Sequence, residues 1–180
     1  MNVPVIRVVG DVLCVVVCFL AAVSDIRTKR IPDYLTLTAL ALGLLLSVSG
    51  GGYSFAGAVM AVVLLGGLFT LFAAAGGLGW GDVKLAAAVG ALLGWPLGAW
   101  SIVLYVLFFT TVIGGVLGLV IAVRRGRLGT TLKAAFRLPR RSSGDSEPQP
   151  SGVYLPYAVA IGLGCCWAVL GRYLPAVLLV

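Results

Sequence analysis

Two aspartates, Asp25 and Asp82, lie at the edges of long apolar stretches, in the segments SDIR and GWGDVK. Ionisable side chains at membrane depth cost free energy, so they are uncommon and usually mark a functional site. Two carboxylates close together cannot both ionise cheaply, so one keeps its proton while the other is charged. The charged one can remove a proton from water while the neutral one polarises a carbonyl group. The pair is therefore a candidate for metal-free hydrolysis.

The other reactive side chains offer few rival mechanisms. The sequence contains no histidine and no plausible pair of a cysteine with a base, which excludes a Ser–His–Asp set and most other rival hydrolytic mechanisms. The four cysteines form no CxxC pair and all fall inside apolar segments; they are Cys14, Cys18, Cys165 and Cys166. We interpret them as small apolar residues, and the sequence predicts no metal site and no cofactor.

Each aspartate also has a simpler explanation. Asp25 can be a charge at a helix end, satisfied by Arg27 or Lys29, and Asp82 can be the N-cap of a helix that follows a glycine turn. The N-cap explanation does not account for the many glycines of GGLGWG at a bilayer edge. Glycine permits unusual dihedrals and the close approach of another segment, so Gly79 and Gly81 are candidate site-shaping residues.

A third aspartate, Asp11, precedes Asp25 by fourteen residues on one predicted helix. At 1.5 Å per residue the two lie about 21 Å apart along the helix axis. Asp11 therefore belongs to the other half of the membrane and cannot join the pair. Arg7, one turn earlier, is a candidate partner for it.

The composition indicates the kind of scaffold that holds these residues. Of the 180 residues, 61% are hydrophobic and only 11% are charged, whereas about a quarter are charged in a soluble domain. We expect one all-α domain over residues 1–180, a polytopic membrane bundle of six transmembrane helices. The predicted spans are residues 5–24, 34–49, 55–75, 83–95, 97–123 and 153–172. The second and fourth are short, so we expect incomplete spans inside the bundle or helices that start below the membrane surface.

The basic residues predict the orientation. Ten of the thirteen lysines and arginines fall in the first and fifth connections between spans, which the positive-inside rule makes cytoplasmic. Asp25 and Asp82 then both lie at the cytoplasmic boundary. Basic residues beside spans favour contact with anionic membrane lipids over nucleic acid. Residues 124–152 are predicted to be a basic, flexible cytoplasmic loop.

Residues 1–24 also have features of a signal peptide, with AVS as a small-residue cleavage site. Their only basic residue is Arg7, and cleavage would leave Asp25 on the extracytoplasmic side, against the charge pattern. We therefore expect a retained first helix.

Three segments resemble the type IV prepilin peptidase family of GxGD-class intramembrane aspartic proteases. They are Asp25 with the following Ile31-Pro32, the run GWGDVKL around Asp82, and LPY at the start of the last helix. The resemblance covers roughly residues 10–123 and 153–170. It implies an aspartic endopeptidase in the prokaryotic cytoplasmic membrane, with Asp25 and Asp82 as its catalytic residues. Its substrates would be type IV pilin-like precursors, cleaved at the cytoplasmic face after a short basic leader that ends in glycine.

The resemblance also suggests substrate-binding or site-shaping roles for Pro32, Lys84, Pro156 and Tyr157. Lys84 could pair with the ionised dyad, contact the substrate or extend to the interface. The sequence lacks the cysteine-containing insertion that accompanies N-methylation in bifunctional members, so it resembles short, peptidase-only forms that serve Flp or Tad-type pili. Asp33 stands where the family often has asparagine. The presenilin-like GxGD group is a weaker match, because Ser24 replaces its tyrosine.

A different class of protein, a channel or transporter subunit, could use the aspartates for ion or proton passage. A conduction path needs polar groups across the whole membrane, whereas both aspartates are predicted at one edge. The depth of the polar residues therefore discriminates between the two classes.

Overall fold

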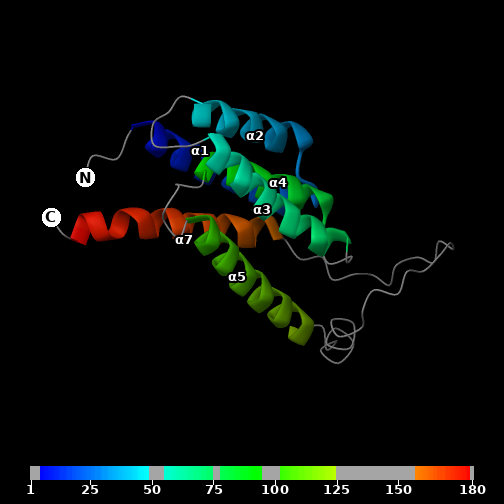
Figure 1. The fold of residues 1–180 in the computed structure, drawn as a ribbon. Coiled ribbons are helices and arrows are strands. Elements are labelled where there is room, and N and C mark those ends of the chain that lie inside the picture. The colour runs from blue at the N-terminus through cyan, green and yellow to red at the C-terminus, as the bar shows by residue number, and fades with distance from the viewer. Residues whose placement is uncertain (1–4, 49–54, 75–77, 95–101, 125–156, 179–180) are drawn as a thin grey trace.

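The computed structural model describes residues 5–48, 55–74, 78–94, 102–124 and 157–178, and contains no strand in these ranges. The helices are α1 (Val5–Thr28), α2 (Asp33–Val48), α3 (Phe55–Ala74), α4 (Trp80–Leu93), α5 (Ile102–Arg124) and α7 (Tyr157–Leu178) (Figure 1). The all-helical prediction is confirmed. The predicted loop beyond Arg124 and the site candidate Pro156 lie outside the described residues.

Two helix bounds differ from the prediction in a way that matters for the aspartates. α1 continues to Thr28, beyond the predicted end at residue 24, and α4 begins at Trp80, before the predicted start at residue 83. The search for apolar stretches in the sequence detects only the part of a helix that can lie in the hydrocarbon core. Backbone hydrogen bonding continues through the polar residues at the helix ends. Asp25 and Asp82 consequently belong to the last turn of α1 and the first turn of α4.

The described ranges contain six helices, as predicted, but six membrane crossings are not confirmed. By length and composition, α1 and α3 can cross a membrane. Shorter apolar segments are α2, Val103–Val116 and Tyr157–Tyr173. A straight crossing needs about 20 residues, so α4, with 14 residues, is too short to cross the hydrocarbon core alone.

The short helix α4 forms the centre of the bundle. It packs against α1, α2, α3, α5 and α7, and its buried residues include every position from Ala88 to Leu93. The expectation of an enclosed fourth helix is confirmed. α2 differs, because it buries only one stripe, Thr36, Ala39, Gly43 and Ser47, and lies on the outside of α4. Gly43 is required there, since a Cβ atom would lie 2.6 Å from the Ala91 carbonyl carbon.

The helices α1 and α7 run antiparallel, which fixes the two ends of the bundle. Asp11 lies beside Arg172, and Cys14 lies beside Cys165. The end of α1 therefore lies with the starts of α2, α4 and α7 at one end, on the right in Figure 1. We call this the Asp25 end. The start of α1 and the end of α7 form the opposite end.

Candidate active site

Asp25 faces the interior of the bundle from the last turn of α1. The buried residues of α1 include Asp11, Cys14, Cys18, Ala21 and Asp25, whose spacing of three and four residues defines one helix face. Only 6% of Asp25 is exposed. The carboxylate is thus held between helices rather than displayed at a solvated helix end.

The turn after Asp25 is closed by hydrogen bonds. The Lys29 N–H donates to the Asp25 carbonyl at 2.9 Å, with Lys29 in the left-handed region at φ 55°. The hydroxyls of Ser24 and Thr28 both donate to the Arg30 carbonyl, each at 3.0 Å. The first bond satisfies one of the carbonyls that α1 leaves unpaired at its end, and the two bonds to the Arg30 carbonyl hold the chain beyond α1 against its last turn.

The same link leads directly into α2. Pro32 precedes the helix, and its carbonyl accepts hydrogen bonds from the Leu35 and Thr36 N–H groups at 3.2 and 3.4 Å. The fixed φ of proline suits this position. Pro32 therefore lies at the start of α2, and the preceding Ile31 is buried.

Asp82 lies in the first turn of α4, but it is not the N-cap, which corrects the simpler explanation given above. The N-cap is Gly79, in an extended conformation with φ −79° and ψ 148°. Its carbonyl accepts hydrogen bonds from Asp82 N–H at 3.1 Å and from Val83 N–H at 3.4 Å. The helix starts earlier because Trp80 and Gly81 adopt helical geometry, so Asp82 is its third residue and turns inward.

The two glycines around Trp80 have different close neighbours. A Cβ atom on Gly79 would lie 3.3 Å from the Asp82 Oδ2, and one on Gly81 would lie 3.3 Å from the Ile31 Cβ. Side chains at these positions would push on the carboxylate and on the link to α2, respectively. Both predicted site-shaping glycines therefore lie where the structure has little room for a larger residue.

The surroundings of Asp82 favour its protonated form. Asp82 lies ahead of the predicted span of residues 83–95 and is 8% exposed. Burial, with a smaller contribution from the negative charge of Asp25, raises its pKa from 3.8 to about 7, while a backbone hydrogen bond from Gly79 acts in the opposite direction. Among the described residues, its Oδ1 atom is buried without a hydrogen-bond partner. The two aspartates thus interact electrostatically although 57 residues separate them in sequence.

Lys84 does not point to the pair. Its Nζ forms an ion pair at 2.7 Å with the Asp33 Oδ1, at the start of α2, and both side chains are largely exposed. This partner was not among the roles predicted for Lys84. Tyr157, the first residue of α7, interacts electrostatically with Asp82; its role at the site stays a prediction. Trp80 is exposed, as expected of an aromatic anchor at the membrane interface.

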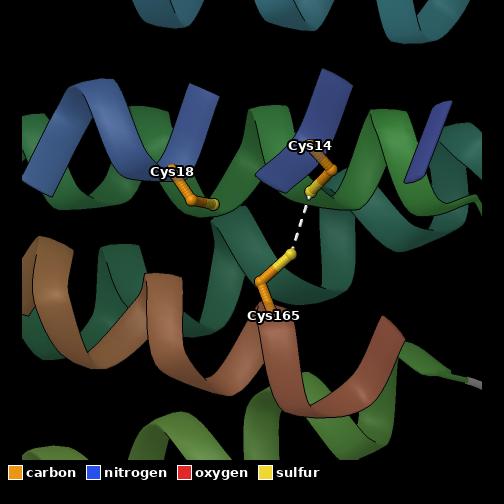
Figure 2. Close-up of side chains that lie close together, drawn as sticks. All are labelled: Cys14, Cys18 and Cys165. Carbon is orange, nitrogen blue, oxygen red and sulfur yellow. Dashed lines mark hydrogen bonds between the residues drawn. The ribbon is translucent and has the colours of Figure 1, made fainter. Parts of the chain in front are cut away.

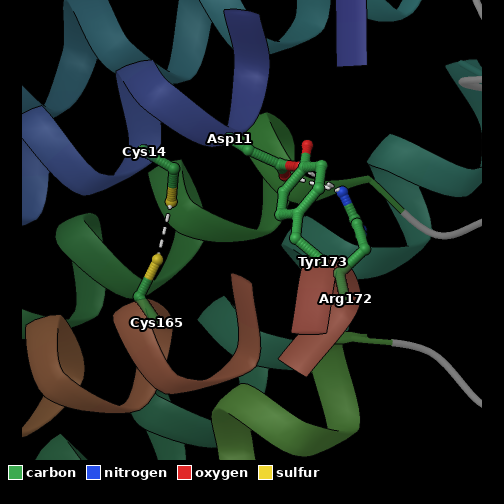
Figure 3. A network of polar contacts seen from close by, with 5 residues as sticks. All are labelled: Asp11, Cys14, Cys165, Arg172 and Tyr173. Carbon is green, nitrogen blue, oxygen red and sulfur yellow. Dashed lines mark hydrogen bonds and ion pairs between the residues drawn. The ribbon is translucent and has the colours of Figure 1, made fainter. Parts of the chain in front are cut away.

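Asp11 lies at the opposite end, as the helix geometry predicted. Its carboxylate accepts hydrogen bonds from Arg172 Nη1 at 2.6 and 2.7 Å and from the Tyr173 hydroxyl at 2.7 Å (Figure 3). The sequence suggested Arg7 and gave no signal for these partners from the last helix. The network ties the start of α1 to the end of α7.

The sequence pattern also failed to predict a cluster of thiols. Cys14, Cys18 and Cys165 are buried side by side between α1 and α7 (Figure 2). The spacing of Cys14 and Cys18 places them on one helix face, but no local pattern connects them to Cys165. Cys166, the neighbouring residue, is exposed.

The sequence is similar to known proteins. The sequence profile of the type IV leader peptidase family matches residues 12–119, a range that includes both aspartates. A prepilin leader peptidase/N-methyltransferase of Aeromonas salmonicida is 33% identical over 146 residues, which are 77% of this chain and 43% of that protein. No solved structure matches the chain closely enough to be counted as similar.

Two further proteins with the same name are similar over shorter ranges. The one from Pectobacterium carotovorum is 45% identical over 80 residues, 41% of this chain and 29% of that protein. The one from Burkholderia pseudomallei is 35% identical over 123 residues, 64% of this chain and 38% of that protein. The chain thus spans less than half the length of these relatives. With the profile matching more than half of its residues, it belongs to the type IV leader peptidase family.

Proposed function

We propose that this protein is an aspartic endopeptidase that removes the short basic leader from type IV pilin-like precursors. The observation that carries the proposal is the pair of buried carboxylates, Asp25 from α1 and Asp82 from α4, which interact at one end of the bundle. Membership of the type IV leader peptidase family supports it, as do relatives named prepilin leader peptidase/N-methyltransferase.

The proposed mechanism divides the two roles between the carboxyl groups. Asp82, with a pKa of about 7, carries the shared proton near neutral pH and donates a hydrogen bond to the scissile carbonyl. Asp25, in its ionised form, removes a proton from the attacking water. The tetrahedral intermediate then collapses as the protonated Asp25 transfers its proton to the leaving amine. The two carboxyl groups act as a unit in this mechanism, so each role depends on both residues.

The proposed setting is the cytoplasmic face of a prokaryotic inner membrane, crossed several times by the chain. Basic residues at the Asp25 end support this orientation: Arg27 in the last turn of α1, Lys29 and Arg30 just after it, and Arg124 at the end of α5. The apolar helix of a pilin precursor would lie against the lipid-exposed helices, with its basic leader on the cytoplasmic side. Flp or Tad-type pilins, which the resemblance to short family members implies, are the proposed substrates.

The polar residues disfavour the alternative of ion or proton conduction. Between Asp11 and Asp25, the buried residues of α1 are Cys14, Val17, Cys18 and Ala21, none of which carries a charge-bearing or strongly polar side chain. In the described part of the chain, the buried carboxylates thus lie at the two ends of the helix bundle and not between them. A single hydrolytic centre at the Asp25 end accounts for this distribution better than a continuous path does.

Co-expression with a pilin-like precursor tests the proposal. Asp25→Asn and Asp82→Asn should each reduce leader cleavage by about 10²–10⁴-fold, the usual contribution of a general acid or base. The matched control is Asp33→Asn, an exposed aspartate at the same end, which should retain cleavage. Cleavage is measured by the mobility shift of the precursor, and membrane levels of each variant by immunoblot.

The controls make the outcomes distinct. Wild-type cleavage by either dyad variant would disprove the proposed mechanism. Loss of cleavage in Asp33→Asn at normal membrane levels would show that the assay responds to any change at this end, and would remove the support for a specific dyad.

A further inference from the structure

Three buried thiols from two helices converge in the middle of the bundle, away from the aspartate pair. Cys14 Sγ and Cys165 Sγ lie 3.1 Å apart, and the sulfur atoms of Cys14, Cys18 and Cys165 all lie within 4.8 Å of one another. At most 1% of each of these residues is exposed. In Figure 2 the thiols of Cys14 and Cys165 point toward each other across the contact between α1 and α7, and Cys18 lies one turn along α1 from Cys14.

We propose that Cys14, Cys18 and Cys165 form a binding site for one copper(I) ion. Thiolate sulfur is a soft ligand, and soft ligands select copper(I), zinc or iron–sulfur clusters. A structural zinc site almost always has four ligands. In the described part of the chain, no fourth Cys, His, Asp or Glu joins the group, so three sulfurs suit copper(I) better than zinc.

The nearest carboxylate is occupied elsewhere. Asp11 lies one turn before Cys14 on α1, but both of its oxygens accept hydrogen bonds from Arg172, and one also from Tyr173 (Figure 3). A hard oxygen ligand is therefore held away from the sulfurs by its own partners. The site that remains consists of sulfur alone, which favours a soft, monovalent ion.

The sulfur positions are compatible with a three-coordinate ion. A metal–sulfur distance of about 2.3 Å places the sulfurs of a trigonal planar site about 4.0 Å apart. All three sulfurs lie within 4.8 Å of one another, and those of Cys14 and Cys165 must separate by about 0.9 Å from their present 3.1 Å to reach this spacing. Each thiol that binds the ion loses its proton to solvent.

The ion would link α1 and α7, which both contribute residues to the surroundings of the aspartate pair. α1 carries Asp25 and α7 carries Tyr157, while Cys14 and Cys165 lie in the middle of the same helices. Binding at the cluster would therefore stabilise the α1–α7 contact. This inference does not rest on the proposed peptidase activity, and its test uses binding and stability alone.

The test uses the full chain, purified in detergent under reducing, anaerobic conditions. Copper(I) is titrated against a colorimetric copper(I) chelator, and the unfolding temperature is measured with and without the ion. We expect one ion per chain and a rise in unfolding temperature. Each of Cys14→Ser, Cys18→Ser and Cys165→Ser should weaken binding by at least about tenfold. Cys166→Ser, the exposed neighbour, is the matched control and should bind as the wild type does.

A measurement on the wild type alone covers the case in which a serine variant fails to fold. X-ray absorption of the copper-loaded protein should show sulfur neighbours and no nitrogen or oxygen neighbours. Equal binding by the wild type and the three variants would overturn the proposal. So would tighter binding of zinc than of copper(I) in a parallel titration, or a copper site that contains oxygen or nitrogen ligands.

Discussion

The substitution Asp82→Asn should abolish cleavage and, at neutral and alkaline pH, stabilise the protein. Asp82 is 8% exposed, and burial and the Asp25 charge raise its pKa from 3.8 to about 7. The folded protein therefore binds this proton more tightly than the unfolded chain does. Well below pH 3.8 the carboxyl is protonated in both states and has no linked effect on stability.

The pH dependence follows from proton linkage. As pH rises from about 4 to 7, the unfolded chain releases the proton while the folded protein keeps it, so the free energy of unfolding falls. Above pH 7 the penalty is constant. A shift of about three pKa units at 1.36 kcal/mol each gives about 4 kcal/mol. Asparagine has nearly the same shape and no charge, so it should remove this penalty at pH 8 and change little at pH 4.

Thermal unfolding in detergent, followed by tryptophan fluorescence, measures the effect. For a chain of this size, about 4 kcal/mol corresponds to a rise of about 10 °C in the unfolding midpoint at pH 8. The control Asp33→Asn should not raise the midpoint, because Asp33 is exposed and forms an ion pair with Lys84. Equal midpoints for the wild type and Asp82→Asn at pH 8 would refute the reasoning. A rise of the same size at pH 4 would also refute it, because the cause would then not be ionisation.

Two further predictions concern the packing around α4. Gly90→Ala should destabilise the protein by about 1–3 kcal/mol, because its Cβ atom would lie 2.7 Å from the Ala61 carbonyl oxygen. The control Gly67→Ala should not destabilise it, because a Cβ atom there has nothing within 4 Å. Thermal unfolding of the two variants measures the effect, and equal destabilisation would contradict the prediction. A double-mutant cycle of Lys84→Met and Asp33→Asn should give a coupling of about 0.2–1 kcal/mol, as for other exposed ion pairs; a coupling well outside that range would show that the pair is not simply a surface contact.

The sequence predicted the helices well because lipid imposes a simple composition on them. Apolar runs located all six described helices, and the polar residues that interrupt these runs indicated where the site lies. The exact helix ends could not be predicted, since backbone hydrogen bonds continue past the apolar run at Thr28 and begin before it at Trp80. This is also why Asp82 was misassigned as an N-cap in the simpler explanation of its position.

Contacts between distant segments had no signal in the local pattern. Lys84 and Asp33 meet because α2 and α4 lie side by side, and the order of the helices in space follows from packing rather than from composition. The same holds for the Asp11 network and for Cys165 beside Cys14. Helix periodicity predicted which residues of α1 share a face, but it could not predict that α7 packs against that face.

The enclosure of α4 has a consequence for the synthesis of the chain. α1 and α4 leave the ribosome well before α7, which contacts both of them. A nascent chain that ends before Tyr157 thus contains both aspartates but lacks α7, which packs against the helices that carry them. We expect the pair to reach its working arrangement only when the last helix has docked, so that incomplete chains and C-terminal truncations remain inert in the membrane.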